Sequence, residues 1–198
     1  MNEIKPIQTY YDGHLFRSRL DARWAVVFNT LSVPYEYEPE GFDLGDGLYY
    51  LPDFRVKCYG CRGNYKLQRP FDLYIEVKGK MTEEDATKIK RFAHWYDETT
   101  YEPLYLGRYP LLIVDSIPGE GCATDIDDYG LGYDLSAFNY ETIDGDYFGA
   151  YPAATRDGKF YLFGADSNYI NDGDAARMER AYRIARCARF EHGERPPV

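Results

Sequence analysis

FDLYIEVKG, at residues 71–79, alternates apolar and polar side chains and predicts a β-strand that ends before its glycine. Successive side chains of a strand point to opposite faces of the sheet. Three apolar residues therefore share the core face: Leu73, Ile75 and Val77. Glu76 and Lys78 project together from the other face. A carboxylate beside an ammonium group at a strand end can hold a divalent cation and the water that attacks a phosphorus atom. An ordinary surface ion pair is the alternative.

A second carboxylate, Asp53, follows Leu51-Pro52 at the end of the preceding predicted strand. If the two strands are neighbours, Asp53 lies across the sheet from Glu76. Mg²⁺ prefers oxygen ligands, commonly one or two carboxylates with phosphate oxygens and waters. Asp53, Glu76 and the Val77 carbonyl would supply such a set. The alternative for Asp53 is a turn aspartate that follows a proline.

Helical and extended patterns flank these strands in the order helix, strand, strand, strand, helix, strand. Residues 16–31 predict an amphipathic helix that a proline ends. Residues 35–38 and 48–56 predict the two strands of a hairpin, and 57–70 a loop or small insertion. The next helix has Thr82 as its N-cap. This order predicts an α/β chain of the α+β type, in which a mixed sheet is flanked by helices.

The second half of the chain adds a few more elements. Residues 111–114 predict a short buried strand, 147–153 and 159–163 a β-hairpin, and 174–190 a last helix. We expect a single domain over residues 1–198. It divides into a core at 10–115, an acidic and aromatic insertion at about 116–145, and a C-terminal hairpin and helix at 146–198.

The composition is that of a folded globular protein. Hydrophobic residues make up 44% and charged residues 28% of the chain. No apolar run reaches the roughly 18 residues that a membrane-spanning helix needs, and the first residues lack the apolar segment of a secretion signal. Four cysteines are too few for a secreted disulfide scaffold. We therefore expect a cytoplasmic protein with no membrane partner.

The negative charge is concentrated in one region. The formal net charge is −10, and an even spread would argue against a polyanionic partner. Between Asp97 and Tyr147, however, there are twelve acidic residues and one basic residue, whereas the rest of the chain carries 22 basic and 21 acidic residues. The charge therefore lowers the expectation of nucleic-acid binding without excluding it.

Four segments together carry a resemblance to a known family. They are residues 16–25 (FRSRLDARWA), 35–42 (YEYEPEGF), 50–54 (YLPDF) and 75–79 (IEVKG). The set resembles the PD-(D/E)XK nuclease superfamily, and within it a branch common in phages and bacterial mobile elements. The resemblance covers residues 10–95 well and the C-terminal half poorly. It implies a restriction-endonuclease-like core, ordered helix, hairpin, strand, helix, strand, in the cytoplasm of a bacterial or phage-infected cell.

The resemblance also implies a reaction, which is metal-dependent hydrolysis of DNA phosphodiester bonds. Asp53, Glu76 and the Val77 carbonyl would bind Mg²⁺ or Mn²⁺. Lys78 would orient the attacking water or help to deprotonate it, and would stabilise charge in the transition state. A nearby cation would lower the pKa of this lysine and suit it to act as a base.

Asp21 is a further candidate in the first predicted helix. The branch usually carries a glutamate at this position, so the resemblance implies that Asp21 is a catalytic carboxylate and a metal ligand. Aspartate is one methylene shorter, which reduces its reach to a metal. The alternative is an ion pair with Arg17, which lies four residues earlier on the same helix.

Basic residues near this site are the expected nucleic-acid contacts. They are Arg17, Arg19, Lys57, Arg62, Lys66, Arg69 and Lys80. Residues 57–69 also hold two tyrosines and no acid. Basic side chains neutralise phosphates and tyrosines stack on bases. The alternative is a solvated loop that offsets the acidic half of the chain.

Cys58 and Cys61 have the spacing of a metal knuckle. A structural zinc needs four ligands, and the remaining cysteines and histidines form no second close pair. We therefore expect free cysteines here and no structural zinc.

Two other functions stay open on the sequence. One is a catalytically silent DNA-binding or regulatory protein on the same fold, against which the presence of Asp53, Glu76 and Lys78 argues. The other is a nuclease domain that acts only as a homodimer or with a protein partner. The form of the DNA, cleavage of RNA, and endonuclease or exonuclease action are not predicted.

Overall fold

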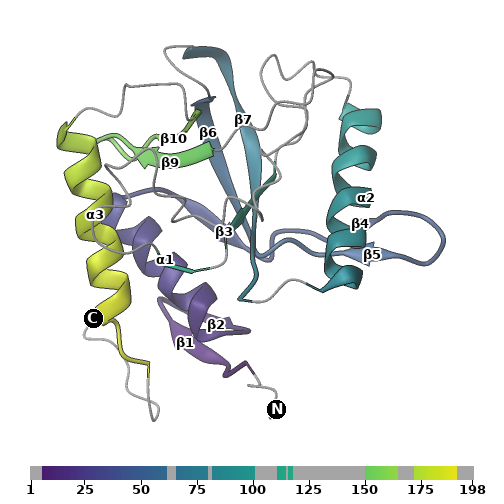
Figure 1. Ribbon diagram of the computed structural model, residues 1–198, viewed down its shortest axis with the longest axis horizontal. Coiled ribbons are helices and arrows are strands. Elements are labelled where there is room, and N and C mark those ends of the chain that lie inside the picture. Colours follow the sequence, from purple (N-terminus) through teal and green to yellow (C-terminus); the bar gives the residue numbers. More distant parts are fainter. Residues whose placement is uncertain are drawn as a thin grey trace.

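The computed structural model has a central β-sheet with helices on both faces (Figure 1). It describes residues 6–61, 66–79, 82–100, 111–114, 116–117, 150–164 and 172–190. Three helices lie within these residues: α1 (Arg19–Leu31), α2 (Glu83–Thr100) and α3 (Asp172–Cys187). The mixed sheet and its helices confirm the predicted mixed class of fold. Nearly all of the expected acidic insertion lies outside the described residues.

The main sheet has six described strands in the order β8-β7-β6-β10-β9, and β3 also pairs with β6. Their bounds are β3 (Tyr35–Tyr37), β6 (Phe54–Cys61), β7 (Lys66–Val77), β8 (Leu111–Val114), β9 (Ala150–Ala154) and β10 (Phe160–Gly164). β6 is antiparallel to β7 and β3 but parallel to β10, and β7 is parallel to β8. β9 and β10 form the predicted C-terminal hairpin. The β6–β7 hairpin is therefore central to a mixed sheet.

Helices α1 and α3 pack together on one face of this sheet. Phe28 of α1 is fully buried and lies against Phe54 of β6 and Phe160 of β10. Trp24 of α1 meets Tyr182 of α3. Within residues 71–77 of β7, every second residue packs in this core, as the alternation at 71–79 predicts. Burial of this apolar surface is the main force that holds the two helices on the sheet.

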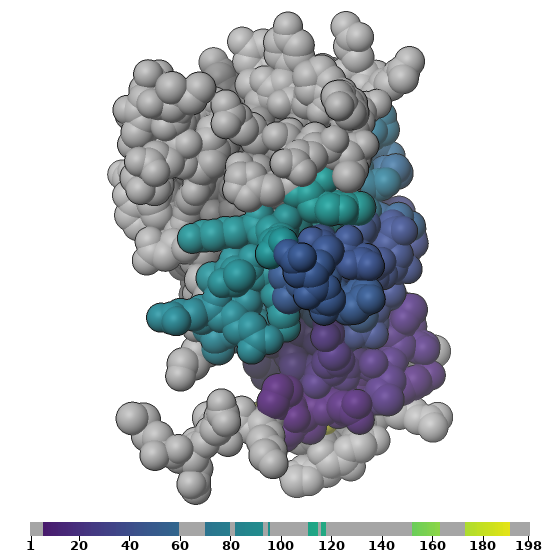
Figure 2. Space-filling view, turned by 90° about the vertical axis from the view of Figure 1, so that its right-hand side faces the viewer, coloured from purple at the N-terminus to yellow at the C-terminus, as the bar shows by residue number. Residues whose placement is uncertain are grey.

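Helix α2 covers the other face, together with a small hairpin formed by β4 (Phe42–Asp43) and β5 (Tyr49–Tyr50). Phe92 of α2 is fully buried, and its ring lies between those of Phe42, Tyr50 and Tyr74. Figure 2 shows α2 and the β4–β5 hairpin next to each other on this side of the molecule. The alternate residues of β7 therefore face a second, smaller core, and Glu76 belongs to this side.

Side-chain caps fix where the helices begin and end. Ser18 caps α1, and its hydroxyl and the Asp21 carboxylate form a capping box. Thr82 and Asp85 make the same arrangement at the start of α2, which confirms the predicted N-cap. Helix α1 ends at Ser32, which has a left-handed φ of 57°. The capping box of α2 brings the Asp85 carboxylate to Lys78, the residue after β7.

The prediction of a loop at 57–70 is wrong, because β6 and β7 extend through most of this segment. β6 continues to Cys61 by pairing with β10 on its second edge, from Cys58 opposite Phe160 onward. β7 already starts at Lys66. Pairing on both edges of β6 satisfies its backbone hydrogen-bonding groups. This tertiary context outweighs the low strand propensity of its glycine and lysine residues.

Two other boundaries also differ from expectation. The strand expected at 48–56 is divided, since β4 and β5 form their own hairpin and β6 begins at Phe54, just after Pro52. The helix expected from residue 16 begins at Arg19, because Phe16 belongs to β2 (His14–Phe16), which pairs with β1 (Thr9–Tyr11). None of the helices in the described ranges is long and apolar enough to cross a membrane.

Candidate functional site

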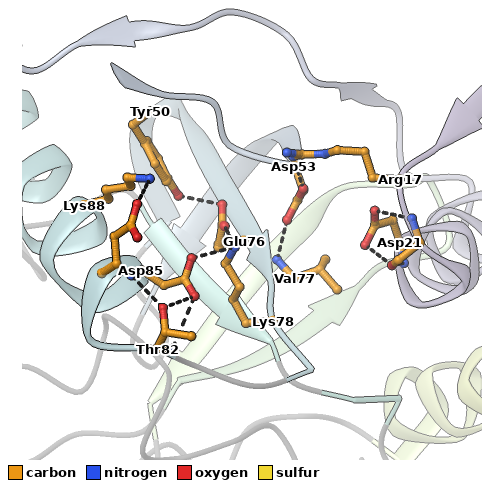
Figure 3. Close-up of polar contacts among 12 residues, drawn as sticks. Arg17, Asp21, Tyr50, Asp53, Glu76, Val77, Lys78, Thr82, Asp85 and Lys88 are labelled. Carbon is orange, nitrogen blue, oxygen red and sulfur yellow. Dashed lines mark hydrogen bonds and ion pairs between the residues drawn. The ribbon is translucent and has the colours of Figure 1, made fainter. Parts of the chain in front are cut away.

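Asp53 and Glu76 lie directly opposite each other across the β6–β7 pair. Phe54 of β6 pairs with Ile75 of β7, so the residue before Phe54 faces the residue after Ile75. The exposed fractions are 4% for Asp53 and 3% for Glu76, and Asp21 at the start of α1 is also 4% exposed. Three carboxylates thus lie buried near the same ends of the strands (Figure 3). Buried carboxylates need compensating partners.

The Glu76 carboxylate has a different partner on each oxygen. The Tyr50 hydroxyl donates to Oε2 at 2.7 Å, and the Lys78 Nζ atom lies 3.0 Å from Oε1. Tyr50 comes from the β4–β5 hairpin and is itself buried. Lys78 and Glu76 project from the same side of the strand, as the alternation predicts. The glutamate is therefore fixed from two directions.

Lys78 is also held by the first turn of α2. Its Nζ atom lies 3.1 Å from Oδ1 of Asp85. The other oxygen of Asp85, Oδ2, accepts hydrogen bonds from the backbone N–H and the hydroxyl of Thr82. The capping box of α2 thus positions the lysine against Glu76 (Figure 3).

The two oxygens of Asp53 are also occupied separately. The backbone N–H of Val77 donates to Oδ2 at 2.7 Å, and Nη2 of Arg17 lies 2.5 Å from Oδ1. Nε of the same guanidinium lies 2.6 Å from Oε1 of Glu38. The sequence left open an ion pair between Arg17 and Asp21. In the structure the Arg17 side chain instead bridges Asp53 and Glu38.

Asp21 is held within its own helix cap. Oδ1 accepts from the Ser18 hydroxyl at 2.6 Å, and Oδ2 accepts from the Ser18 backbone N–H at 3.1 Å. The Tyr37 hydroxyl donates a longer bond of 3.4 Å to Oδ2. Capping accounts for the placement of Asp21, and its role as a metal ligand stays a prediction.

Burial dominates the electrostatics of the three carboxylates. It raises the pKa of Asp21 and of Glu76 above their usual values, although Ser18 opposes the shift of the first and Lys78 that of the second. For Asp53, burial and then the charges of Glu76 and Asp21 raise the pKa to about 8. The site therefore holds more negative charge than its surroundings stabilise.

The pKa of Lys78 is raised, in contrast to the lowering that would suit a base. Burial alone would lower this pKa, but the carboxylates of Glu76 and Asp85 together raise it by more. The ammonium form is therefore favoured at neutral pH. This environment suits a hydrogen-bond donor and positive charge better than a proton acceptor.

The donor atoms at Asp53 and Glu76 fit a hard dication. Two carboxylates and a backbone carbonyl are oxygen ligands, and Mg²⁺ completes such a set with waters and phosphate oxygens. Among the residues with described positions, no three Asp, Glu, His or Cys side chains gather closely enough to hold a metal ion. Asp21 is thus not brought into one group with Asp53 and Glu76.

Only some of the expected nucleic-acid contacts can be placed. Arg19 is half-buried in the first turn of α1, and Lys57 is exposed and pairs with Asp72 at 2.6 Å. Arg17 contacts Asp53 and Glu38, as described above. Four others lie outside the described residues or have side chains that the structure does not describe: Arg62, Lys66, Arg69 and Lys80. Cys58 is buried in the core, and the side chain of Cys61 is not described.

The sequence reasoning missed the contact of Tyr50 with Glu76 and the pairing of Arg17 with Asp53 and Glu38. Tyr50 lies in a separate short hairpin, so no spacing connects it to Glu76. From the sequence, Asp85 could be identified only as the capping-box partner of Thr82, three residues earlier, and not as a site residue. Its contact with Lys78 follows from how α2 packs.

Comparisons with known proteins found no match among protein-family models, curated proteins or solved structures. The chemistry of the buried carboxylates and of Lys78 is therefore the basis for a functional assignment.

Proposed function

We propose that this protein is a metal-dependent nuclease that hydrolyses DNA phosphodiester bonds on a restriction-endonuclease-like core. The observation that carries the proposal is the pair of buried carboxylates, Asp53 and Glu76, on facing strands with Lys78 beside them. Buried carboxylates with strongly shifted pKa values cluster at functional sites. The motif resemblance and this placement point to the same residues.

The arrangement of elements supports the proposed core. A helix precedes the site on one face, Asp53 directly precedes β6, Glu76 lies in β7, and α2 follows on the other face before β8. This is the order helix, hairpin, strand, helix, strand that the resemblance implies. The additional β9–β10 hairpin extends the same sheet on the far side of β6.

Asp53, Glu76 and the Val77 carbonyl are the groups that would hold Mg²⁺ or Mn²⁺. When bound, such a cation polarises the scissile phosphate and lowers the pKa of a coordinated water. Tyr50 keeps the Glu76 carboxylate in one orientation by donating to Oε2. The Val77 N–H does the same for Oδ2 of Asp53. These contacts reduce the reorganisation needed when substrate binds.

Lys78 acts in this proposal as a positioned cation. Its Nζ atom is held between Glu76 and Asp85 and keeps its proton. An ammonium group in this position orients a water by hydrogen bonding and stabilises the negative charge that develops on the phosphate. We therefore assign to Lys78 the orientation of the attacking water and the stabilisation of charge.

A catalytically silent DNA-binding protein is the second candidate, and one observation favours it. The guanidinium of Arg17 already lies 2.5 Å from Oδ1 of Asp53, an oxygen that a cation would use. A protein that keeps the fold but has lost the metal would be expected to hold such an internal counter-charge. The two candidates differ in whether metal ions bind and whether DNA is cut.

A cleavage assay distinguishes these candidates. The full chain is incubated with linear, nicked, branched and single-stranded DNA and with RNA, in Mg²⁺, Mn²⁺ or EDTA. We expect cleavage of DNA with either metal, none in EDTA, and none by Glu76→Gln. Glu84→Gln, at an exposed acid of α2, is the control and should retain activity. Cleavage in EDTA would overturn the metal mechanism, and DNA binding without cleavage under any metal would establish the silent candidate.

A further inference from the structure

We propose that Arg17 is a displaceable counter-ion: it competes with the metal for Asp53 and, once released, binds a phosphate of the substrate. This inference rests on the proposed function and adds to it a residue that connects metal loading with DNA binding.

Both oxygens of Asp53 already have a partner. Oδ2 accepts a hydrogen bond from the backbone N–H of Val77, which belongs to the sheet and cannot turn away. Oδ1 contacts the Arg17 guanidinium at 2.5 Å. A cation that coordinates Oδ1 would place two like charges within a few ångströms of each other. The metal and Arg17 are therefore alternative partners of the same oxygen.

The backbone of Arg17 is held in place, whereas its guanidinium is exposed enough to change partner. Its backbone N–H donates to the Tyr37 hydroxyl at 2.9 Å, and it directly precedes Ser18, the N-cap of α1. Its side chain is 51% exposed, whereas that of Asp53 is 6% exposed. The guanidinium can thus exchange its partner for solvent or for substrate at low cost, and Asp53 cannot.

An ion pair with Glu38 would keep the released guanidinium near the site. Its Oε1 atom lies 2.6 Å from Nε of Arg17, and its side chain is 30% exposed. The backbone N–H of Glu38 donates to the carbonyl of Asp53 at 2.8 Å. This hydrogen bond keeps Glu38 next to Asp53. After displacement, Arg17 would keep this one carboxylate and present free N–H groups.

A guanidinium with free N–H groups beside a metal site is suited to a phosphodiester. Its planar fork donates two parallel hydrogen bonds to phosphate oxygens, which an ammonium group cannot do. The local balance of charge favours the exchange. Arg17 and Lys78 face five carboxylates, namely Asp21, Glu38, Asp53, Glu76 and Asp85. An incoming dication therefore lowers repulsion among the acids even though it displaces Arg17.

The test measures Mn²⁺ binding by isothermal titration, with no DNA present, for wild type and Arg17→Met. Removing the competitor should tighten Mn²⁺ binding about five-fold, the equivalent of about 1 kcal/mol for a half-exposed ion pair. Arg17→Lys keeps the positive charge without the planar guanidinium, and its affinity for Mn²⁺ should lie between those of wild type and Arg17→Met. Arg55→Met is the matched control, because Arg55 also bridges two carboxylates, Glu36 and Glu40, and it should match wild type.

The second measurement is DNA binding in Ca²⁺, a hard cation that also takes oxygen ligands. Arg17→Met should bind a DNA duplex about ten-fold more weakly than wild type, because one bidentate phosphate contact is lost. Arg55→Met should bind as wild type does. Thermal unfolding of each variant in EDTA verifies that it is folded before either measurement.

The outcomes separate this inference from the proposed function. If wild type binds Mn²⁺ and Arg17→Met binds it no more tightly, Arg17 is no competitor and the inference is overturned while the metal site stands. If Mn²⁺ binding tightens but DNA binding is unchanged, the phosphate role is overturned. If neither wild type nor Arg17→Met binds Mn²⁺, and Asp53→Asn changes nothing, the proposed function fails and the inference fails with it.

Discussion

Lys78 keeps its Nζ atom 3.0 Å from Oε1 of Glu76, two residues earlier on the same strand. This contact follows from the two-residue repeat of a β-strand, which places both side chains on one face at the end of β7. The contact brings a fixed positive charge to a buried carboxylate.

Removing the ammonium group should abolish most activity. We expect Lys78→Met to lower kcat about 100-fold or more in saturating Mg²⁺, since a positioned donor at the reacting phosphate is lost. It should also cost on the order of 1–2 kcal/mol of stability, because a buried carboxylate loses a partner. Lys88→Met, which removes an ion pair with Glu84 on α2, is the control. Full activity of Lys78→Met would exclude the assigned role.

Neutralising Asp53 should stabilise the protein in EDTA, in a pH-dependent manner. The folded pKa is raised to about 8, so the folded state binds more protons than the unfolded state between the ordinary pKa of 3.8 and that value. Stability is then lost as the pH rises through this range. Asp53→Asn should be more stable than wild type by roughly 1–3 kcal/mol at pH 8 and nearly equal at pH 4.

Urea unfolding at the two pH values checks this prediction. A variant that is less stable than wild type at pH 8 would show that the ion pair with Arg17 outweighs the burial of Asp53. The same variant should have no nuclease activity, so that stability is gained where function is lost.

The cap of α2 should influence catalysis through Lys78. Thr82→Ala removes the donor that holds Asp85, and it should cost about 1 kcal/mol of stability. It should also lower kcat with little change in KM, because the lysine is positioned less well. Thr82→Ser should restore both values. Thr87→Ala, at another hydroxyl of the same helix, should leave kcat unchanged. An equal loss of kcat in both alanine variants would contradict the positioning role.

Gly158 tests the packing of the C-terminal hairpin. It has φ = +76°, and a Cβ atom there would lie 2.1 Å from the carbonyl oxygen of Ser32. Gly158→Ala should therefore destabilise the fold by about 2–4 kcal/mol, through strain and the collision with backbone. Gly47→Ala is the matched control, with φ = +75° but no atom within 4 Å, and it should cost only about 1 kcal/mol. Equal losses in urea unfolding would contradict this packing.

The acids of the candidate site could be placed from the sequence because local rules decide their geometry. Alternation puts Glu76 beside Lys78, and the pairing of two neighbouring strands puts Asp53 opposite Glu76. The caps at Ser18 and Thr82 follow equally from short-range patterns. These features need no knowledge of distant contacts.

The remaining features depend on tertiary packing. β6 extends to Cys61 because β10, about a hundred residues later in the chain, pairs with its second edge. Arg17 reaches Asp53 because the start of α1 lies against the start of β6, and neither residue's own segment indicates the other. Tyr50 reaches Glu76 from a hairpin whose position is set by α2. Single-sequence patterns do not encode such contacts.

The most direct test of the central claim is anomalous diffraction at the manganese edge from crystals soaked in Mn²⁺. The account predicts a peak within direct coordination distance of both the Asp53 and the Glu76 carboxylates, absent from crystals of Asp53→Asn. A peak elsewhere, or no peak in wild type at saturating Mn²⁺, would contradict the claim that these two acids form a metal site.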